Sequence, residues 1–400
     1  MLALISLCRS ANHPIIYVPG LMGNTLFVTR SKKPNHFYCR GRVVDEPFLG
    51  SIASFFPPFH KCKLDDIALG YDNATGEFVA QENVTVRTKY FGGARSLLCP
   101  GTVVGKLGCL NSFKDSLRYL RERGYREHEN FFVAPNDWRY GFKMTPAFHS
   151  QLKTLVEEVY ERQGKVVILA HSQGCAITQY FLNTFVTDEW REKHIEFLVY
   201  SGPSFGGIPF ALAWYVGEDY LSHGRILGTK EFLGLRDLPP VHYHFPHPDF
   251  FGNKTVLVTP EGQELNTTEA IEYVVRLGED PFLADKLAEA EKVREVVMRN
   301  TGLHVKMIYQ SGVSTIKAVL LNGTLFRKGL AFGRGDFLVP EETPLWIKEH
   351  FNTTPDSVID VAEFDKKCKH PGLIREHSPL KTILDLMGVE QSPDERASEL

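Results

Sequence analysis

The sequence predicts an α/β fold built around one mainly parallel sheet. Two observations lead to this prediction. Short, unbroken apolar runs recur along the 400 residues, and segments with helical spacing of apolar residues alternate with them. Unbroken apolar runs are typical of parallel strands that helices cover on both faces. The helices between them would then be the crossovers that join one parallel strand to the next.

Five apolar runs are predicted to be strands: IIYV at 15–18, FFVA at 131–134, VVILA at 166–170, FLVY at 197–200 and VKMIY at 305–309. Helices are predicted between them, because apolar residues in 110–120 and 152–159 recur three or four positions apart. The second helix is expected to end at Gly164, since glycine is frequent directly after a helix.

Two regions interrupt this alternation. Residues 36–100 contain turns, aromatic residues and the apolar stretch FLGSIASFFPPF at 48–59, while residues 205–265 contain scattered Gly, Pro, His and aromatic residues. We interpret both as excursions from a single domain that spans residues 13–400. The stretch at 48–59 fits a surface that dips into lipid, where apolar side chains are buried at the interface. A hydrophobic patch folded into the core is the alternative.

The charge balance argues against nucleic acid as a partner. The chain has 45 Lys and Arg against 48 Asp and Glu, a formal net charge of −3, and no block of like charges. Nucleic-acid phosphates are bound by concentrated Lys and Arg, which this sequence lacks. It also has no apolar run of about 18 residues, the length that argues for a membrane-spanning helix.

Signals of the secretory pathway are individually weak but agree with one another. Residues 1–12 fit a possible truncated signal segment, because an apolar stretch runs from Leu2 to Cys8, although a basic start is missing. Six candidate glycosylation sites follow, at Asn73, Asn83, Asn253, Asn266, Asn322 and Asn352.

The seven cysteines form no metal-binding pattern. They stand at 8, 39, 62, 99, 109, 175 and 368, without CxxC or His-rich spacing, so zinc is not expected. Cys39 and Cys62 fall in predicted loops and are compatible with a disulfide, but the pattern alone leaves their pairing open.

One serine stands where a buried strand meets a helix. The segment Ala170-His171-Ser172-Gln173-Gly174 is close to G-x-S-x-G, the nucleophile elbow, in which a sharp turn exposes the serine oxygen. Small residues are needed around the turn because strand and helix approach closely, and Ala170 and Gly174 meet this need. We therefore predict Ser172 as a nucleophile, with an ordinary polar turn as the alternative and His171 as a structural neighbour.

A serine hydroxyl needs a histidine to take its proton and a carboxylate to orient that histidine. On this type of fold the acid and then the histidine follow the serine along the chain. Asp336 in FGRGDFLVP fits the acid, at the end of a predicted strand. His370 and His377 in KHPGLIREHSPLK are the candidates for the base, and loop placement favours His370.

The tetrahedral intermediate needs two backbone N–H donors, one directly after the serine and one in the loop after an early strand. Gln173 is expected to supply the first. The loop in IIYVPGLMGN follows the first predicted strand and makes Leu21 the second. The alternative is an ordinary turn after a strand, in which the glycines serve only to allow the backbone conformation.

These segments together resemble the lecithin:cholesterol acyltransferase family, and within it the lysosomal phospholipase A2 group. HPIIYVPGLMGN is similar to the family's HPVVLVPGxLGN, FFVAPNDWRYG to its APYDWR, ILAHSQG to its VAHSMG and SGPSFGG to its GAPWGG. FGRGDFLVP resembles the GDGTV segment that holds the acid, which matches Asp336. HPGLI fits the family's H-x-x-[ML]-[LI] pattern, which strengthens His370 over His377.

The resemblance implies an α/β-hydrolase core, a lid over the active site and a membrane-binding excursion in a loop that Cys39 and Cys62 close. It implies transfer of an acyl chain from a glycerophospholipid, through a serine ester, to water or a lipid alcohol, with no metal or organic cofactor. The partner would be a phospholipid membrane surface, bound peripherally, in the lysosome, the vacuole or the extracellular space. The acyl groove would involve Trp214, Tyr215, Tyr220 and HYHFPHPDFF, although aromatic residues there also suit lid packing.

The chain departs from the family pattern at several positions. Phe337 and Leu338 replace the small-polar Gly-Thr pair after the acid, Phe205 replaces a tryptophan, and Leu21 stands where Asp or Cys is typical. Cys99, Cys109 and Cys368 do not match the family's second disulfide. These departures remove no catalytic group but leave the acceptor and the pH optimum open.

Two other functions are alternatives to the phospholipid hypothesis. A neutral lipase or thioesterase could use the same fold, because fold does not fix substrate. A non-catalytic lipid-binding protein could keep the same scaffold, although a complete triad with both oxyanion loops argues against it.

Overall fold

The computed structural model describes residues 12–32, 37–48, 59–98, 113–215, 237–278, 280–321 and 330–389. Several sequence-based expectations fall outside these ranges: the possible signal segment apart from its last residue, positions 49–58 of the apolar stretch, Tyr220, Asn322, Cys8, Cys99 and Cys109. Within the described ranges, none of the helices combines the length and hydropathy needed to cross a bilayer.

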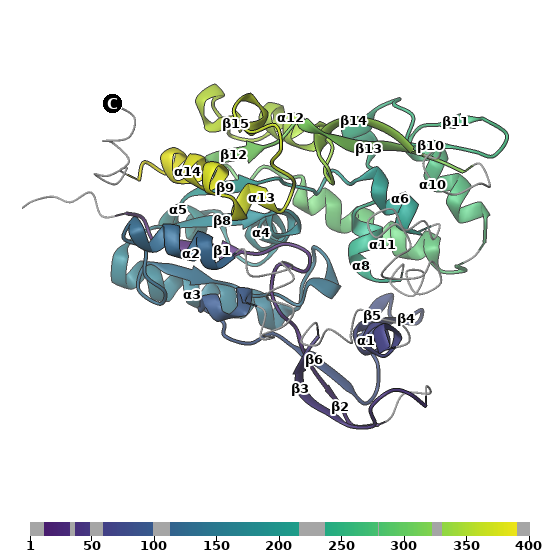
Figure 1. Ribbon diagram of the computed structural model, residues 1–400, viewed down its shortest axis with the longest axis horizontal. Coiled ribbons are helices and arrows are strands. Elements are labelled where there is room, and N and C mark those ends of the chain that lie inside the picture. Colours follow the sequence, from purple (N-terminus) through teal and green to yellow (C-terminus); the bar gives the residue numbers. More distant parts are fainter. Residues whose placement is uncertain are drawn as a thin grey trace, which may run out of the picture.

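The centre of the molecule is a six-stranded, wholly parallel sheet with the strand order β15-β12-β9-β8-β1-β7 (Figure 1). Its strands are β1 (Ile15–Val18), β7 (Phe131–Val133), β8 (Val166–His171), β9 (Ile195–Ser201), β12 (Val305–Tyr309) and β15 (Val358–Asp360). The five predicted strands are confirmed. The sixth, β15, was not predicted, because its sequence VID contains a charged residue and forms no unbroken apolar run.

Helices cover both faces of this sheet because neighbouring residues of a strand point to opposite sides. In β1, Ile16 and Val18 belong to one buried cluster, which α3 (Pro146–Gln163), α4 (Gln173–Thr184) and α11 (Leu283–Val297) complete. Ile15 and Tyr17 belong to the cluster on the other face, which is completed by α2 (Phe113–Glu122), α13 (Gly372–Arg375) and α14 (His377–Leu386). Helix α3 ends at Gly164 as predicted.

A second sheet was not predicted. It has four strands in the order β11-β10-β13-β14: β10 (Leu257–Val258), β11 (Glu264–Leu265), β13 (Gly312–Leu320) and β14 (Leu330–Asp336). β13 and β14 pair antiparallel over their length, and β14 ends at Asp336. The strand expected to end at Asp336 is therefore present, as part of a larger sheet.

Residues 27–30, together with residues from the first excursion, build a small layer beside the central sheet, seen at the bottom of Figure 1. It contains an antiparallel sheet of β2 (Phe27–Arg30), β3 (Val43–Pro47) and β6 (Val84–Arg87), the helix α1 (Phe59–Ile67), and a hairpin of β4 (Leu69–Asp72) and β5 (Glu77–Ala80). Leu26 and Val28 pack here with Ile67 and Trp138, so this layer has its own buried cluster.

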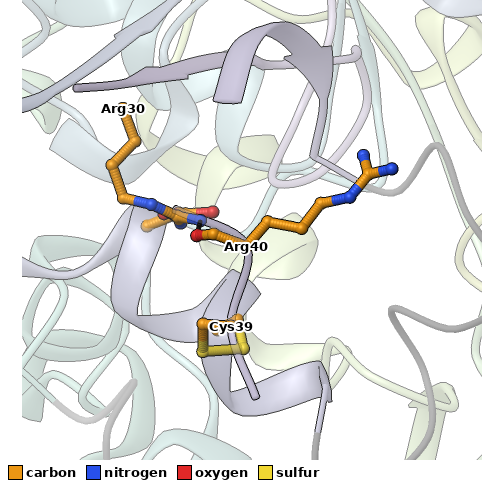
Figure 2. Close-up of a disulfide and its surroundings, with 5 residues drawn as sticks. Arg30, Cys39 and Arg40 are labelled. Atoms are coloured by element: carbon orange, nitrogen blue, oxygen red, sulfur yellow. Dashed lines mark hydrogen bonds and ion pairs between the residues drawn. A yellow bond between two sulfur atoms is a disulfide. The ribbon is translucent and has the colours of Figure 1, made fainter. Parts of the chain in front are cut away.

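The disulfide that the family resemblance implies is confirmed: Cys39 is bonded to Cys62, with a Cα–Cα distance of 5.7 Å. It ties the loop before β3 to helix α1. Arg30 reinforces the same junction, because its guanidinium pairs with buried Asp66 on α1 and donates at 2.8 Å to the backbone carbonyl of Arg40 (Figure 2). Cys175 and Cys368 are free and buried.

The second excursion contains short helices rather than irregular chain: α6 (Pro209–Tyr215), α8 (Pro239–Tyr243) and α9 (Pro248–Phe251). Helix α11 holds this region with charged side chains. Buried Arg294 donates to the carbonyls of Tyr243 and Phe245 at 2.9 and 3.0 Å, and buried Lys286 pairs with Asp237 at 3.0 Å. The part around α8 is therefore fixed to the body of the molecule.

The remaining helices connect these layers: η2 (Ala94–Leu97), η4 (Trp138–Tyr140), α5 (Asp188–His194), α10 (Thr267–Arg276), α12 (Glu342–His350), η5 (Pro355–Ser357) and η6 (Val361–Glu363). A parallel sheet whose inner strand β8 runs directly into helix α4, with Ser172 between them, is an α/β-hydrolase fold.

Candidate active site

Ser172 lies in a sharp turn between the end of β8 and the start of α4. Its backbone has φ 56° and ψ −127°, a region that glycine occupies easily and other residues rarely. The turn is held by a hydrogen bond from the Ser172 N–H to the Ser201 carbonyl at 3.0 Å and by one from the Cys175 N–H to the Ser172 carbonyl at 3.0 Å. Strain of this kind persists only where the surroundings enforce it, and it is frequent at active sites.

Small residues around this turn are required by close backbone contacts. A Cβ atom added to Gly174 would lie 2.3 Å from the carbonyl oxygen of Val18, and one added to Gly20 would lie 2.7 Å from the carbonyl oxygen of His171. The first turn of α4 and the loop after β1 therefore press directly against the serine turn. This is the physical reason for the small residues that the sequence shows here.

Asp336 and His370 form a buried pair. Nδ1 of His370 donates to Oδ2 of Asp336 at 2.6 Å, and the two residues are 2% and 4% exposed. The other carboxylate oxygen accepts the backbone N–H groups of Leu338 and Val339 at 3.0 and 2.6 Å. An ionised carboxylate has no proton to donate, so Nδ1 must be the donor in this hydrogen bond. The neutral imidazole therefore carries its proton on Nδ1, and Nε2 keeps a free lone pair.

His370 lies beside the serine turn. Its ring centroid is 4.8 Å from that of His171, and a Cβ atom added to Gly202 would lie 3.2 Å from the His370 ring. Gly202 directly follows Ser201, whose carbonyl accepts the N–H of Ser172. Nε2 of His370 is buried and has no hydrogen-bond partner among the described residues. An unpaired acceptor of this kind is free to take a proton, which is what a general base does.

The two other histidines near these segments have different surroundings. Nε2 of His171 donates to the backbone carbonyl of His370 at 3.1 Å, and burial lowers the pKa of His171 well below its usual value. His377 begins helix α14, and its ring centroid is 4.1 Å from that of Tyr119. His370, not His377, is therefore the histidine paired with Asp336.

The loop after β1 meets the first residue of α4. Gly20 to Gly23 form a turn closed by a hydrogen bond of 2.9 Å, with Met22 at φ 55°, and a Cβ added to Gly20 would lie 3.3 Å from the Gln173 nitrogen. N–H groups in the first turn of a helix have no partner within the helix. The turn that carries Leu21 thus lies against the helix start that carries Gln173.

A buried amide network around this loop was not predicted. Asn24 and Asn136 bond each other reciprocally, and Asn136 also donates to the Pro19 carbonyl at 2.7 Å. The sequence argument considered only groups that would touch a reacting atom. The two asparagines are 112 positions apart, so no local pattern marks the pair.

A second buried contact links the second excursion to the loop after β9. Ser204 donates to Nε2 of His244 at 2.9 Å, and Nδ1 of His244 donates to the Pro240 carbonyl at 2.7 Å. Burial is the main cause that lowers the pKa of His244 to about 4, so this ring is neutral near pH 7. A backbone bond from Ile208 to His244, 2.8 Å, completes the junction.

In the described part of the chain, one group of side chains lies close enough together to coordinate a metal ion. The ligand atoms of Asp365, Cys368 and Glu376 lie within 4.8 Å of one another. However, Asp365 Oδ1 already accepts the backbone N–H groups of Lys367 and Cys368 at 3.1 Å, and burial raises the pKa of the Cys368 thiol far above its usual range. A protonated thiol is a poor ligand, so the group is better explained as a closed turn.

Comparison with known proteins adds to this geometry. Residues 48–220 match the family model described as Lecithin:cholesterol acyltransferase. The chain resembles the lecithin:cholesterol acyltransferase family. The range that matches the lecithin:cholesterol acyltransferase model includes Cys62 and Ser172 and ends before Asp336 and His370.

Curated relatives are similar to part of this chain. The "Lysosomal phospholipase A and acyltransferase" of Bos taurus is 31% identical over 205 residues, which cover 50% of this chain and 49% of the relative. The "Phosphatidylcholine-sterol acyltransferase" of Rattus norvegicus is 29% identical over 205 residues, 49% of this chain and 45% of the relative. The "Lecithin-cholesterol acyltransferase-like 1" of Oryza sativa subsp. japonica is 25% identical over 270 residues, 62% and 57%. The chain spans about half the length of the curated relatives that it matches.

Among solved structures, the lipase BlEst2 from Bacillus licheniformis has 12% sequence identity and a TM-score of 0.35, with 94% of this chain and 92% of that chain covered. A Listeria innocua protein has 10% identity and a TM-score of 0.32, with 96% of both chains covered. Similarity this low adds nothing to the assignment of function.

Proposed function

We propose that this protein is a serine-dependent acyl hydrolase or O-acyltransferase that takes an acyl chain from a glycerophospholipid. The observation that carries the proposal is the buried Asp336–His370 hydrogen bond of 2.6 Å beside the strained turn of Ser172. Nucleophile, orienting acid and base (Ser172, Asp336 and His370) follow one another along the chain in the order that this fold uses.

The first half of the reaction forms an acyl-enzyme. Ser172 Oγ attacks the ester carbonyl carbon while Nε2 of His370 takes the hydroxyl proton. Asp336 holds the ring in the Nδ1–H tautomer and stabilises the imidazolium that forms. The N–H groups of Leu21 and Gln173 stabilise the oxyanion. When the tetrahedral intermediate collapses, the bond to the lysophospholipid oxygen breaks and His370 returns its proton to that oxygen.

The second half releases the acyl chain. Water or the hydroxyl group of a lipid alcohol attacks the carbonyl carbon of the serine ester while His370 takes the proton of the attacking group. When this second tetrahedral intermediate collapses, the bond between the acyl carbon and Ser172 Oγ breaks, and His370 passes that proton to Ser172 Oγ. Hydrolysis and transfer differ only in which hydroxyl reaches the ester. The reaction needs no redox step.

The substrate class is inferred from the relatives. The names of the bovine and rat proteins describe a phospholipase A with acyltransferase activity and a phosphatidylcholine-sterol acyltransferase. A glycerophospholipid donor is common to both names. We infer that this chain takes the same donor from a membrane surface that it binds peripherally through residues 36–100.

A location in the secretory pathway, in the lysosome, the vacuole or the extracellular space, fits the covalent structure. Disulfides persist mainly in oxidising compartments, and the Cys39–Cys62 bond closes a loop within the first excursion. Four candidate glycosylation asparagines, Asn73, Asn83, Asn253 and Asn352, are exposed, which leaves them accessible to modification. Asn266 is partly buried as the N-cap of α10.

The test uses the purified chain with mixed phospholipid and triacylglycerol vesicles, with and without a long-chain lipid alcohol. Released fatty acid, lysophospholipid and acylated alcohol are expected from the phospholipid. Ser172→Ala is expected to lose about a million-fold in rate, as removal of a triad nucleophile typically does. Ser357→Ala, which removes a different buried hydroxyl, is the matched control.

A serine-directed fluorophosphonate separates the alternatives. Labelling that disappears in Ser172→Ala and persists in Ser357→Ala supports the nucleophile. Retained activity in Ser172→Ala would refute the proposal. Acyl release from triacylglycerol alone would replace the phospholipid donor with a neutral lipid, and lipid binding without labelling would indicate a non-catalytic protein.

A further inference from the structure

The loop after β1 is anchored by side-chain amides to which the proposed reaction assigns no role. Asn136 Nδ2 donates to the Pro19 carbonyl at 2.7 Å. The Asn136 backbone N–H donates to Oδ1 of Asn24 at 3.0 Å, and Asn24 Nδ2 donates back to the Asn136 carbonyl at 2.9 Å. One residue therefore holds the loop at Pro19, before the Gly20–Gly23 turn, and at Asn24, directly after it.

The same short segment also reaches the other side of the site. Trp138 Nε1 donates to the Asn24 carbonyl at 3.2 Å, and the Gln173 side chain donates to the Trp138 carbonyl at 3.2 Å. Asn24, Asn136, Trp138 and Gln173 are between 0% and 6% exposed, so water does not compete for these bonds. Residues 136–138 are thus bonded both to the loop that carries Leu21 and to the residue that supplies the other proposed donor.

This arrangement determines the distance between the backbone N–H groups of Leu21 and Gln173. An oxyanion is stabilised only when both donors point at one place, about 3 Å from each. The position of Leu21 depends on where Pro19 and Asn24 are held, and the position of Gln173 depends on the start of α4. Since both are tied to residues 136–138, a shift of that segment would change the separation of the two N–H groups.

We propose that Asn136 is a positioning residue that, together with Asn24, sets the geometry of the oxyanion pocket. The inference rests on the proposed function, because it assigns a role to Asn136 in the same acyl transfer. Residue 136 is the single position at which Ala134–Arg139 differs from the APYDWR motif, so this contact belongs to this chain and does not follow from the resemblance.

One atom of the Asn136 amide is left unpaired within the described part of the chain. The Oδ1 atom of Asn136 is buried with no hydrogen-bond partner among the described residues, and a buried unpaired polar atom is unfavourable. An apolar side chain at 136 would avoid that cost but would leave the Pro19 carbonyl without its donor. We therefore expect substitution to affect the catalytic rate more than the stability.

The experiment compares Asn136→Leu with Asn183→Leu, using a soluble short-chain ester so that membrane binding plays no part. Asn183 is the matched control, because its amide donates to the carbonyls of Val296 and Arg299 at 3.0 and 2.9 Å, at the other end of α4. Asn136→Leu is expected to lower kcat by about 10- to 100-fold and to change KM less than about threefold, since displacing an oxyanion donor costs less than removing one. Asn183→Leu should keep the wild-type kcat.

Asn136→Asp provides a second readout if Asn136→Leu does not fold. A protonated carboxylic acid can donate to the Pro19 carbonyl, and an ionised carboxylate cannot. The kcat of Asn136→Asp, divided by that of the wild type at each pH, should therefore rise as the pH falls. A ratio that does not change with pH would overturn the proposal, as would a wild-type kcat in Asn136→Leu.

Fluorophosphonate labelling of the wild type separates this inference from the function on which it rests. If wild-type Ser172 is labelled and both Asn136 variants are labelled at the wild-type rate, the positioning role is wrong while the function stands. If wild-type Ser172 is not labelled, both proposals fail together.

Discussion

Two hydrogen bonds join His370 to Asp336, one between side chains at 2.6 Å and one from the His370 backbone N–H to the Asp336 carbonyl at 2.8 Å. The backbone bond fixes the His370 loop against the end of β14, and the side-chain bond fixes the rotation of the ring. The placement of the imidazole is thus determined by the fold before any substrate arrives.

His370→Ala is expected to slow acyl-enzyme formation nearly as much as Ser172→Ala, because a serine hydroxyl without a base is almost inert near neutral pH. His377→Ala should have a mild effect, because His377 packs against Tyr119 and is not the histidine paired with Asp336. The rate of fluorophosphonate labelling measures both variants. Fast labelling of His370→Ala together with slow labelling of His377→Ala would show that the wrong base was chosen.

Gly20→Ala is expected to abolish most activity. The new Cβ would lie 2.7 Å from the His171 carbonyl oxygen and from Ser172 Cβ, so the loop or the serine turn has to move. Overpacking of this kind typically costs about 1–3 kcal/mol of folding free energy. The matched variant is Gly41→Ala, whose Cβ would meet no atom within 4 Å. Thermal melting and ester hydrolysis should be unchanged in Gly41→Ala, and a wild-type rate in Gly20→Ala would contradict the close contact.

Removal of the Cys39–Cys62 bond is expected to destabilise the first excursion by about 3 kcal/mol, because the bond closes a loop between residues 23 positions apart. The double variant Cys39→Ser/Cys62→Ser should lose liposome binding more than hydrolysis of a soluble ester, since Ser172, Asp336 and His370 lie outside that loop. Reductant should reproduce the effect in the wild type and add nothing in the variant. Equal losses in both assays would mean that the loop also supports the catalytic residues.

His242 should make the fold sensitive to acid. Its ring stacks on Phe78, and both ring nitrogens are buried without a partner in the described part of the chain. Burial is the main cause that lowers its pKa from 6.5 to about 3, with Lys286 lowering it further and Asp280 opposing. Between these two pH values the unfolded chain binds the proton and the folded chain does not. His242 therefore costs no free energy of unfolding above pH 6.5. Below that pH the free energy of unfolding decreases as the pH falls, by roughly 2–3 kcal/mol at pH 4.5.

His242→Phe keeps an aromatic ring against Phe78 and removes this proton. Its melting temperature is expected to fall less than that of the wild type between pH 7 and pH 4.5. His350→Phe, at an exposed histidine, should keep the wild-type slope. Parallel slopes in the wild type and His242→Phe would show that other groups control acid unfolding.

The sequence predicted the central sheet well because its strands are buried on both faces. Runs such as VVILA have no polar residue to interrupt them, and β8 is fully buried as expected. Strand β13 shows the opposite case. Its residues GVSTIKAVL alternate between exposed and buried positions only in part, so the strand has no clean period of two.

The candidate site was predictable where function leaves a local pattern. Ser172 stands in a recognisable turn motif, and Asp336 and His370 could be chosen by their order and their flanking residues. Asn24 and Asn136 could not be found in this way, because their proposed role depends on a hydrogen bond between residues 112 positions apart. The burial of the His242 and His244 rings could not be predicted from the sequence either, because it depends on elements that are distant in sequence.

The place of β1 between β7 and β8 has a consequence for synthesis of the chain. β1 spans residues 15–18, but its partners in the sheet begin only at residues 131 and 166. At about 5–20 residues per second, the ribosome needs roughly 10–30 s to make the second partner after β1 has formed. During that interval the segment IIYV lacks at least one of its two partner strands and, as an apolar strand sequence, is prone to pair with other chains. We therefore expect nascent chains stalled shortly before residue 131 to bind chaperones that recognise exposed apolar segments, and chains released beyond residue 171 to bind them far less.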